Sequence, residues 1–219
     1  MPARSHKLGV FGGTFNPVHT GHLRLAEDVR EEFSLDTILF IPTNIPPHKH
    51  APESLGPAAR LKMIKLAIQK NPNFLCEDME LKRGGVSYTI DTIRHLYERY
   101  ALDERPYLII GSDLAATLDT WKEIGSLLGL VRIVVLTRAG HALTGPGVLP
   151  PEEEGENWFR YEKRTIDITS SEVRGRVRSG RSIRYLVPDK VLEYIKEKGL
   201  YRSAAATAGP ENEGDTTPC

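Results

Sequence analysis

Short apolar runs recur along the chain, and the stretches between them place apolar residues at helical intervals. The run at 37–41 is apolar and rich in β-branched residues, which is typical of a buried strand in a parallel sheet. We predict six strands, at residues 8–11, 37–41, 74–76, 106–110, 131–137 and 165–168.

Amphipathic helices are predicted between and after these strands. In one of them, at 58–70, Met63, Ile64, Ala67 and Ile68 form an apolar side, and Arg60 is expected elsewhere on the helix. The other predicted helices run from about 23 to 33, from 87 to 100, from 114 to 130 with a break around 119–121, from 170 to 179 and from 187 to 198.

Alternating strands and helices predict an α/β fold with a doubly wound, mostly parallel, Rossmann-like sheet flanked by helices. We expect one domain over residues 1–202, with a small C-terminal helical part at about 170–202. Residues 139–162, rich in Gly and Pro and then acidic, are expected to form an exposed, mobile excursion. Residues 203–219 lack an apolar pattern and are expected to be a disordered tail.

Composition narrows the classes of function. The chain has 29 basic and 29 acidic residues, so no overall field favours nucleic acid or an anionic membrane. No apolar run is long enough for a membrane span or a signal peptide, and we expect a cytoplasmic protein. Cys76 and Cys219, the two cysteines, argue against a disulfide framework or a cysteine-based zinc site.

The stretch Gly12–Leu23 is the strongest chemical signal in the sequence. Two glycines follow the first predicted strand, and His19 and His22 lie where the next helix should begin. Exposed N–H groups and the helix dipole at such a turn suit an anion, above all a phosphate. The two histidines could instead be zinc ligands, but no Cys or nearby Asp or Glu completes a site.

A second motif comes late in the chain, where Thr169, Ser170 and Ser171 precede Arg174. Taken alone, it could be a helix cap with an exposed arginine. Paired with the H-x-G-H of residues 19–22, it resembles the nucleotidyltransferase superfamily, and within it the bacterial nicotinate-nucleotide adenylyltransferase family. The supporting stretches are residues 12–19, 46–49, 87–89, 111–113 with Trp121, and 199–201. The family usually writes its last motif I-S-S-T-x-[IV]-R, and this chain exchanges Ser and Thr within it.

The resemblance implies transfer of the adenylyl group of ATP to nicotinic acid mononucleotide, which gives deamido-NAD and pyrophosphate. This reaction needs positioning and charge stabilisation rather than a protein nucleophile. The implied catalytic residues are His19, His22, Lys49 and Arg174. The implied ATP- and phosphate-binding residues are Gly12, Gly13, Thr14, Phe15, His48, Gly111, Asp113, Thr169, Ser170 and Ser171. Mg²⁺ is expected on the nucleotide oxygens, with no dedicated protein cage.

For the second substrate, the resemblance puts the pyridine ring against Trp121 and its carboxylate on backbone N–H groups around Tyr88 and Thr89, with Ser87 and Asn44 in the same pocket. The expected partners are ATP and nicotinic acid mononucleotide, with no nucleic acid and no membrane, and a homo-oligomer is compatible with the sequence. Two alternatives stay open: a related transferase acting on nicotinamide mononucleotide or phosphopantetheine, and a nucleotide-binding regulator without turnover.

Overall fold

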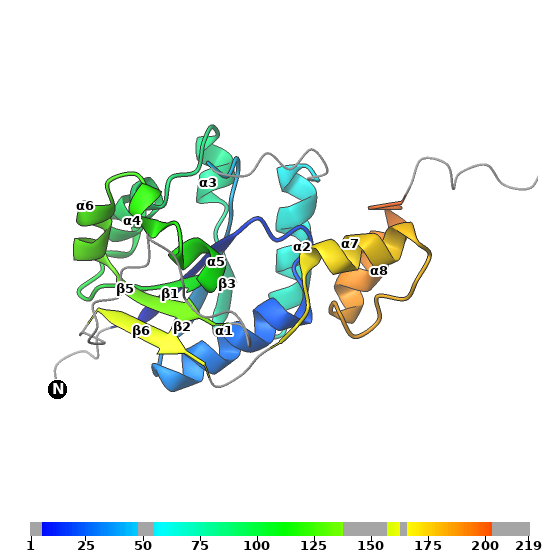
Figure 1. The fold of residues 1–219 in the computed structure, drawn as a ribbon, viewed down its shortest axis with the longest axis horizontal. Coiled ribbons are helices and arrows are strands. Elements are labelled where there is room, and N and C mark those ends of the chain that lie inside the picture. Colours follow the sequence, from blue (N-terminus) through cyan, green and yellow to red (C-terminus); the bar gives the residue numbers. More distant parts are fainter. Residues whose placement is uncertain (1–5, 48–54, 138–156, 163–165, 203–219) are drawn as a thin grey trace, which may run out of the picture.

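A parallel sheet of six strands forms the centre of the protein in the computed structural model, which describes residues 6–47, 55–137, 157–162 and 166–202 (Figure 1). The strand order is β3-β2-β1-β4-β5-β6, and each neighbouring pair is parallel. The strands are β1 (Leu8–Gly13), β2 (Thr37–Pro42), β3 (Phe74–Cys76), β4 (Tyr107–Gly111), β5 (Arg132–Leu136) and β6 (Trp158–Tyr161).

Helices cover both faces of the sheet. They are α1 (Thr20–Glu32), α2 (Pro57–Ile68), α3 (Met79–Arg83), α4 (Thr89–Tyr100), α5 (Ser112–Ala115), the 3₁₀ turn η1 (Leu118–Thr120), α6 (Ile124–Leu130), α7 (Ser170–Arg178) and α8 (Asp189–Glu197). Successive strand residues point to opposite faces, so Phe40 packs in the core with α1, α2, α7 and α8, while Leu39 packs with α4 and α6. In Figure 1, α7 and α8 lie beside α2, at the end of the molecule away from α4 and α6.

The predicted fold class is confirmed. The strand order 3-2-1-4-5-6 is that of a doubly wound Rossmann-like sheet, whose ligands bind where the chain reverses direction across the sheet. That switch point lies between β1 and β4, which are neighbours in the sheet. Among the described residues, no helix has the length and apolar character needed to cross a membrane.

The sixth strand was predicted in the wrong place. Residues 166–169 are not a strand but the approach to α7, and the observed strand β6 lies inside the segment expected to be an exposed excursion. Trp158 and Tyr161 are buried against β5 and its neighbours, whereas Arg160 is exposed. An edge strand with one polar face lacks the continuous apolar run that marked the others. Residues 138–156, 163–165 and the predicted tail lie outside the described residues.

Arg60 was predicted to lie away from the apolar side of α2, and this was wrong. Its side chain is buried, with an exposed fraction of 2%. It lies on the same face as Met63 and Ile64, which the helical spacing places one turn away. The short helix α3 was not predicted, because it is five residues long and carries no clear periodic pattern.

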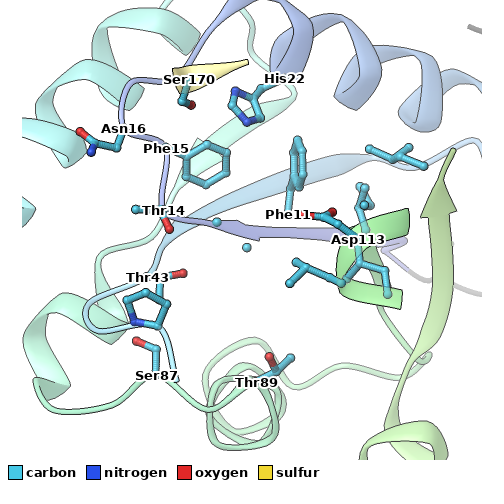
Figure 2. Close-up of a pocket in the computed structure, with 18 of the residues that line it drawn as sticks. Phe11, Thr14, Phe15, Asn16, His22, Thr43, Ser87, Thr89, Asp113 and Ser170 are labelled. Atoms are coloured by element: carbon cyan, nitrogen blue, oxygen red, sulfur yellow. The ribbon is translucent and has the colours of Figure 1, made fainter. Parts of the chain in front are cut away.

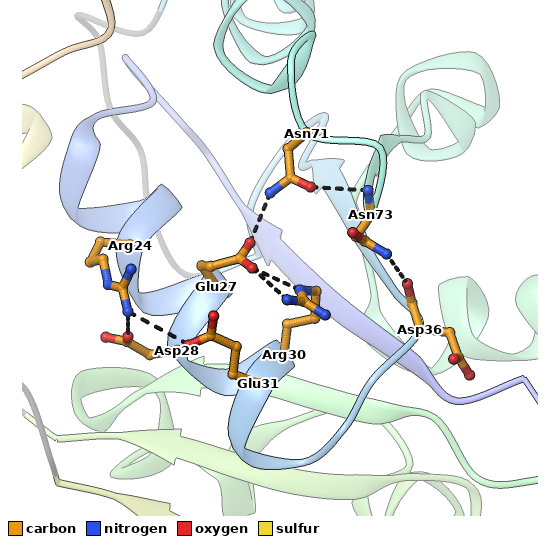
Figure 3. Close-up of polar contacts among 8 residues, drawn as sticks. All are labelled: Arg24, Glu27, Asp28, Arg30, Glu31, Asp36, Asn71 and Asn73. Atoms are coloured by element: carbon orange, nitrogen blue, oxygen red, sulfur yellow. Dashed lines mark hydrogen bonds and ion pairs between the residues drawn. The ribbon is translucent and has the colours of Figure 1, made fainter.

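A polar network holds the end of α1 against the start of the sheet (Figure 3). Glu27 accepts hydrogen bonds from Arg30 Nη2 at 2.7 Å and from Asn71 Nδ2 at 2.8 Å. Asn71 also accepts from the Asn73 backbone N–H at 3.0 Å, and Asn73 Nδ2 donates to the Asp36 carbonyl just before β2. The network joins α1 to the turn between α2 and β3 and so fixes the helix that starts at the candidate site.

Candidate functional site

A cavity of about 910 Å³ opens beside the carboxyl ends of β1 and β4. Figure 2 shows His22 and Ser170 on one side of it and Ser87 and Thr89 on the opposite side. Sixteen of the predicted site residues line this cavity: Gly12, Gly13, Thr14, Phe15, His19, His22, Ser87, Tyr88, Thr89, Gly111, Asp113, Trp121, Thr169, Ser170, Ser171 and Arg174. Motifs spread over most of the chain therefore meet at one place.

Gly12 and Gly13 are the last two residues of β1, although the sequence predicted them to follow the strand, and both line the cavity. A Cβ atom on Gly12 would meet no atom within 4 Å, so this backbone is open to a ligand. Phe15 adopts a left-handed backbone conformation, with φ of 47°, and its ring is buried. That ring packs edge-on against the imidazole of His22 with 5.1 Å between centroids, and Phe11 lies 5.9 Å away. The two phenyl rings hold the His22 ring in place.

His19 and His22 form a stacked pair at the start of α1. His19 is the N-cap residue, and its backbone N–H donates to Nδ1 of His22 at 3.2 Å. The ring centroids are 3.6 Å apart. Because Nδ1 of His22 accepts this hydrogen bond, the proton of its neutral imidazole lies on Nε2. His22 therefore presents a ring N–H donor beside the cavity.

The glycine between the two histidines has a steric reason. A Cβ atom on Gly21 would lie 3.0 Å from Nδ1 of His19 and 3.2 Å from Cγ2 of Ile166. The buried His19 ring thus occupies space that any side chain at position 21 would need. The H-x-G-H spacing follows from this packing as well as from chemistry.

The start of α7 is fastened to the glycine loop. Thr169 Oγ1 caps the helix by accepting from the Glu172 N–H at 3.0 Å. Ser170 Oγ donates to the Pro17 carbonyl at 2.8 Å, and Arg174 Nη1 donates to the Asn16 carbonyl at 2.8 Å. The single hydroxyl proton of Ser170 is used in this contact, so at this residue the backbone N–H, and not the hydroxyl, is the donor that remains for an anion.

The opposite side of the cavity is a pocket with an aromatic character. Trp121 and Tyr88 line it, and Nε1 of Trp121 is buried without a hydrogen-bond partner among the described residues. Lys122, also in the lining, places Nζ 4.8 Å from the Tyr88 ring centroid and 3.1 Å from Oδ2 of Asp91. An indole N–H without a partner and a helix start at Thr89 suit a planar ligand that carries acceptor groups.

Asn44 lies behind this pocket and is not among its lining residues. Its backbone N–H donates to Ser87 Oγ at 2.9 Å, and its Nδ2 donates to the Gly85 carbonyl at 2.9 Å. Asn44 thus holds the turn that precedes α4. His48 and Lys49, predicted as a phosphate ligand and a catalytic residue, lie outside the described residues.

At the β4 end, Asp113 folds back over the turn that precedes it. A Cβ atom on Gly111 would lie 2.6 Å from Oδ1 of Asp113, so only glycine is tolerated there without rearrangement. This arrangement keeps the Asp113 carboxylate at the cavity wall, on the side of Phe11 away from Phe15 (Figure 2).

Sequence reasoning missed Glu80, which is 7% exposed and lines the cavity. Burial raises the pKa of the Glu80 carboxyl, while hydrogen bonds from Thr92 and Ser87 oppose the rise. Arg60 was missed as well, and burial lowers the pKa of its guanidinium. The position of Arg60 one turn before Met63 and Ile64 was a signal for its burial.

The described residues contain no cluster of side chains suited to holding a metal ion. Within residues 6–47, 55–137, 157–162 and 166–202, no group of three or more His, Cys, Asp or Glu side chains could hold a metal ion. The zinc alternative for His19 and His22 therefore gains no third ligand from this part of the chain. A Mg²⁺ ion carried on phosphate oxygens needs no such group, because it keeps several waters and binds few carboxylates.

The switch point of this doubly wound sheet carries two glycines at the end of β1, an H-x-G-H helix start and a second helix start. These features together define a class of nucleotidyltransferase. The cytidylyltransferase-like family model matches residues 10–176. A relative from Geobacter sp. (strain M21), named "Probable nicotinate-nucleotide adenylyltransferase", is 42% identical over 217 residues, which cover 90% of this chain and 99% of the relative. A relative of the same name from Geobacillus thermodenitrificans (strain NG80-2) is 41% identical over 211 residues, which cover 96% and 93%. The chain belongs to the nicotinate-nucleotide adenylyltransferase family.

Solved structures support the fold. Nicotinic acid mononucleotide adenylyltransferase of Plasmodium falciparum, solved in complex with NaAD, aligns with a TM-score of 0.70 at 18% identity over 90% of this chain and 98% of that one. The same enzyme complexed with APC aligns with a TM-score of 0.68 at 16% identity, over 90% and 97%. At these identities the likeness shows the fold alone.

Proposed function

We propose that this protein transfers the adenylyl group of ATP to nicotinic acid mononucleotide, giving deamido-NAD and pyrophosphate in NAD biosynthesis. The acceptor's phosphate oxygen attacks the α-phosphorus, the bond from that phosphorus to the bridging oxygen breaks, and pyrophosphate leaves. One observation supports this most: His22 and Ser170, at the starts of α1 and α7, lie across a single cavity from Ser87 and Thr89, at the start of α4.

On the ATP side, the glycine turn and the N–H groups at the start of α7 would hold the triphosphate. The Nε2–H of His22 would donate to the charge that develops at the α-phosphorus, and His19 would fix the His22 ring. Arg174 would act at the same wall, where its guanidinium is oriented by the Asn16 carbonyl and Ser171 Oγ. Lys49 and His48 would contact the phosphates, and Asp113 would lie at the adenosine end of ATP, near the ribose.

Enzymes of the nucleotidyltransferase family generally use a divalent metal with ATP. We propose Mg²⁺ for this protein, bound to the phosphate oxygens, where it would neutralise charge on the leaving pyrophosphate. The described residues around the cavity offer no cluster of metal ligands, and Mg²⁺ bound to ATP needs none, because phosphate oxygens and waters would supply its ligands.

On the acceptor side, the pyridine ring would stack against Trp121. The Nε1–H of Trp121 has no hydrogen-bond acceptor among the described residues, and a polar group of the ligand could supply one. The pyridine carboxylate would bind the N–H groups at the start of α4, around Tyr88 and Thr89. A carboxylate accepts from two such donors, whereas the amide of nicotinamide presents one oxygen and an NH₂ group. This difference would make the nicotinate form the preferred acceptor.

The test incubates the purified full-length protein with ATP, Mg²⁺ and one acceptor at a time, and measures pyrophosphate together with the adenylylated product. Release with nicotinic acid mononucleotide that greatly exceeds the acceptor-free background is expected. Release only with phosphopantetheine would overturn the acceptor assignment, and tight ATP binding without release would indicate a regulator.

A further inference from the structure

Arg60 is the largest side chain that the described core buries completely, although it carries a full charge. It extends from the first turns of α2 toward the cavity wall but does not line the cavity. A buried cation is costly unless each donor finds an acceptor. Its partners therefore show what the charge is for.

The guanidinium donates to three backbone carbonyls from three separate stretches. Nε donates to the Leu55 carbonyl at 3.1 Å, Nη1 to the Thr14 carbonyl at 2.8 Å, and Nη2 to the Asn44 carbonyl at 3.5 Å. Thr14 directly follows β1 and its last glycine, and Asn44 lies in the loop after β2. One rigid planar group thus contacts both loops.

Among the described residues, the strand pairing between β1 and β2 stops before Thr14 and Asn44. The β1–β2 register ends at Gly13 and Pro42, and one more backbone bond follows, from the Thr43 N–H to the Gly13 carbonyl at 2.9 Å. Beyond it, one loop leads to α1 and the other to α2. Arg60 continues the connection past the end of the ladder.

From Asn44 the contacts run on to the acceptor pocket. The Asn44 N–H donates to Ser87 Oγ at 2.9 Å, and the Ser87 N–H donates to the Ile45 carbonyl at 2.9 Å. Ser87 is buried directly before Tyr88 and the start of α4. A continuous path of hydrogen bonds therefore leads from Thr14 through Arg60 and Asn44 to Ser87, in the turn that we propose to face the pyridine ring.

We infer that Arg60 is a positioning residue that sets the spacing between the ATP half-site and the acceptor half-site. This inference rests on the proposed function. Two nitrogens of one rigid guanidinium fork contact the Thr14 and Asn44 carbonyls, which a lysine ammonium with its single nitrogen cannot reproduce. The expected defect of a substitution is a wrong spacing between two half-sites that are each intact.

A ligand that spans both half-sites reports the spacing. Deamido-NAD occupies both at once, so its affinity depends on their match, whereas a non-hydrolysable ATP analogue and nicotinic acid mononucleotide each probe one half. The experiment measures Kd for these three ligands and kcat in the wild type and in Arg60→Lys. Lys62→Met, an exposed position on the same helix, is the matched control.

For Arg60→Lys, we expect Kd for deamido-NAD to rise at least about tenfold and kcat to fall by a similar factor, with both single-site Kd values within about threefold. Unchanged deamido-NAD affinity and kcat would overturn the inference, and so would a parallel rise of all three Kd values. A wild type that binds ATP but forms no deamido-NAD would instead refute the proposed function.

Ser87→Ala gives a second variant on the same path, which decides the matter where Arg60→Lys does not fold. It removes the hydroxyl that accepts from Asn44 and leaves Arg60 in place. Because Ser87 also lines the acceptor pocket, we expect a loss of deamido-NAD affinity of about threefold or more beyond any loss for nicotinic acid mononucleotide alone. Full retention of that affinity would contradict the path.

Discussion

The backbone N–H of His19 donates to Nδ1 of His22 across 3.2 Å, and this contact leaves Nε2 as the other nitrogen of a ring that lines the cavity. One end of the imidazole therefore takes part in the helix cap, and the other end is the donor that we propose for catalysis. The two roles of His22 can be separated by a side chain that reproduces only one end.

His22→Asn keeps an acceptor near the Nδ1 position but has no donor at the Nε2 position. We expect kcat to fall by about a hundredfold or more, with KM for ATP within about threefold and little change in Tm. Steady-state kinetics with thermal unfolding checks this, and His95→Asn, on the exposed side of α4, is the control. An increase in KM without loss of kcat would contradict a transition-state role.

Arg174 is oriented by two acceptors, the Asn16 carbonyl at 2.8 Å and Ser171 Oγ at 3.1 Å. Arg174→Lys keeps the charge but cannot contact both and still reach a phosphate. We expect kcat/KM for ATP to fall by about ten- to a hundredfold. Arg178→Lys, one turn further along α7, should stay near wild type, and equal effects of both changes would argue against a specific role for Arg174.

Two ion pairs join α4 to the turn after Trp121: in one, α4 supplies the acid, and in the other it supplies the base. Asp91 contacts Lys122 at 3.1 Å, and Arg94 contacts Glu123 at 2.6 Å. Because they hold the Trp121 turn beside Tyr88, Asp91→Lys should raise KM for the acceptor about two- to fivefold and leave KM for ATP unchanged. The double change Asp91→Lys with Lys122→Asp should recover part of this loss, because it restores the ion pair but also alters the cavity lining at Lys122. A KM no lower than that of Asp91→Lys alone would indicate that the pair does not position the turn.

The network in Figure 3 predicts a pH-dependent stability. Burial disfavours the charged form of Glu27, but hydrogen bonds from Arg30 and Asn71 outweigh this, and the pKa of Glu27 is lowered. A lowered folded-state pKa stabilises the protein above the unfolded value, about 4.3, and this contribution is lost as pH falls through the folded value.

Glu27→Gln should therefore lower the free energy of unfolding by about 1–2 kcal/mol at pH 7, with the difference shrinking below about pH 4. Urea unfolding at several pH values measures it, and Glu31→Gln, at an exposed neighbouring position, is the control. A difference that does not depend on pH would show that the ionised form of Glu27 is not responsible.

Much of the fold could be predicted because its signals are local. Five strands were placed within two residues of their observed ends, since each buried parallel strand is a short apolar run between turn residues. The edge strand β6 escaped because it is four residues long and Arg160 interrupts its apolar run. Its burial depends on pairing with β5, which no local pattern records.

Some residues of the candidate site could also be predicted from local signals, and others could not. Residues next to strand ends and helix starts, such as His22 and Ser170, were predicted because motifs mark them. Arg60 and Glu80 were not, because the acceptors and donors that make their burial tolerable come from other segments. A buried charge is a tertiary property, and only the assembled loops reveal it.

The central claim is that this cavity adenylylates the nicotinate form of the mononucleotide in preference to the amide form. The most direct measurement places nicotinic acid mononucleotide and nicotinamide mononucleotide in equal concentration with ATP, Mg²⁺ and the full-length protein, and determines the initial ratio of deamido-NAD to NAD by mass spectrometry. The account predicts an excess of deamido-NAD of at least about tenfold. A ratio near one, or an excess of NAD, would contradict it.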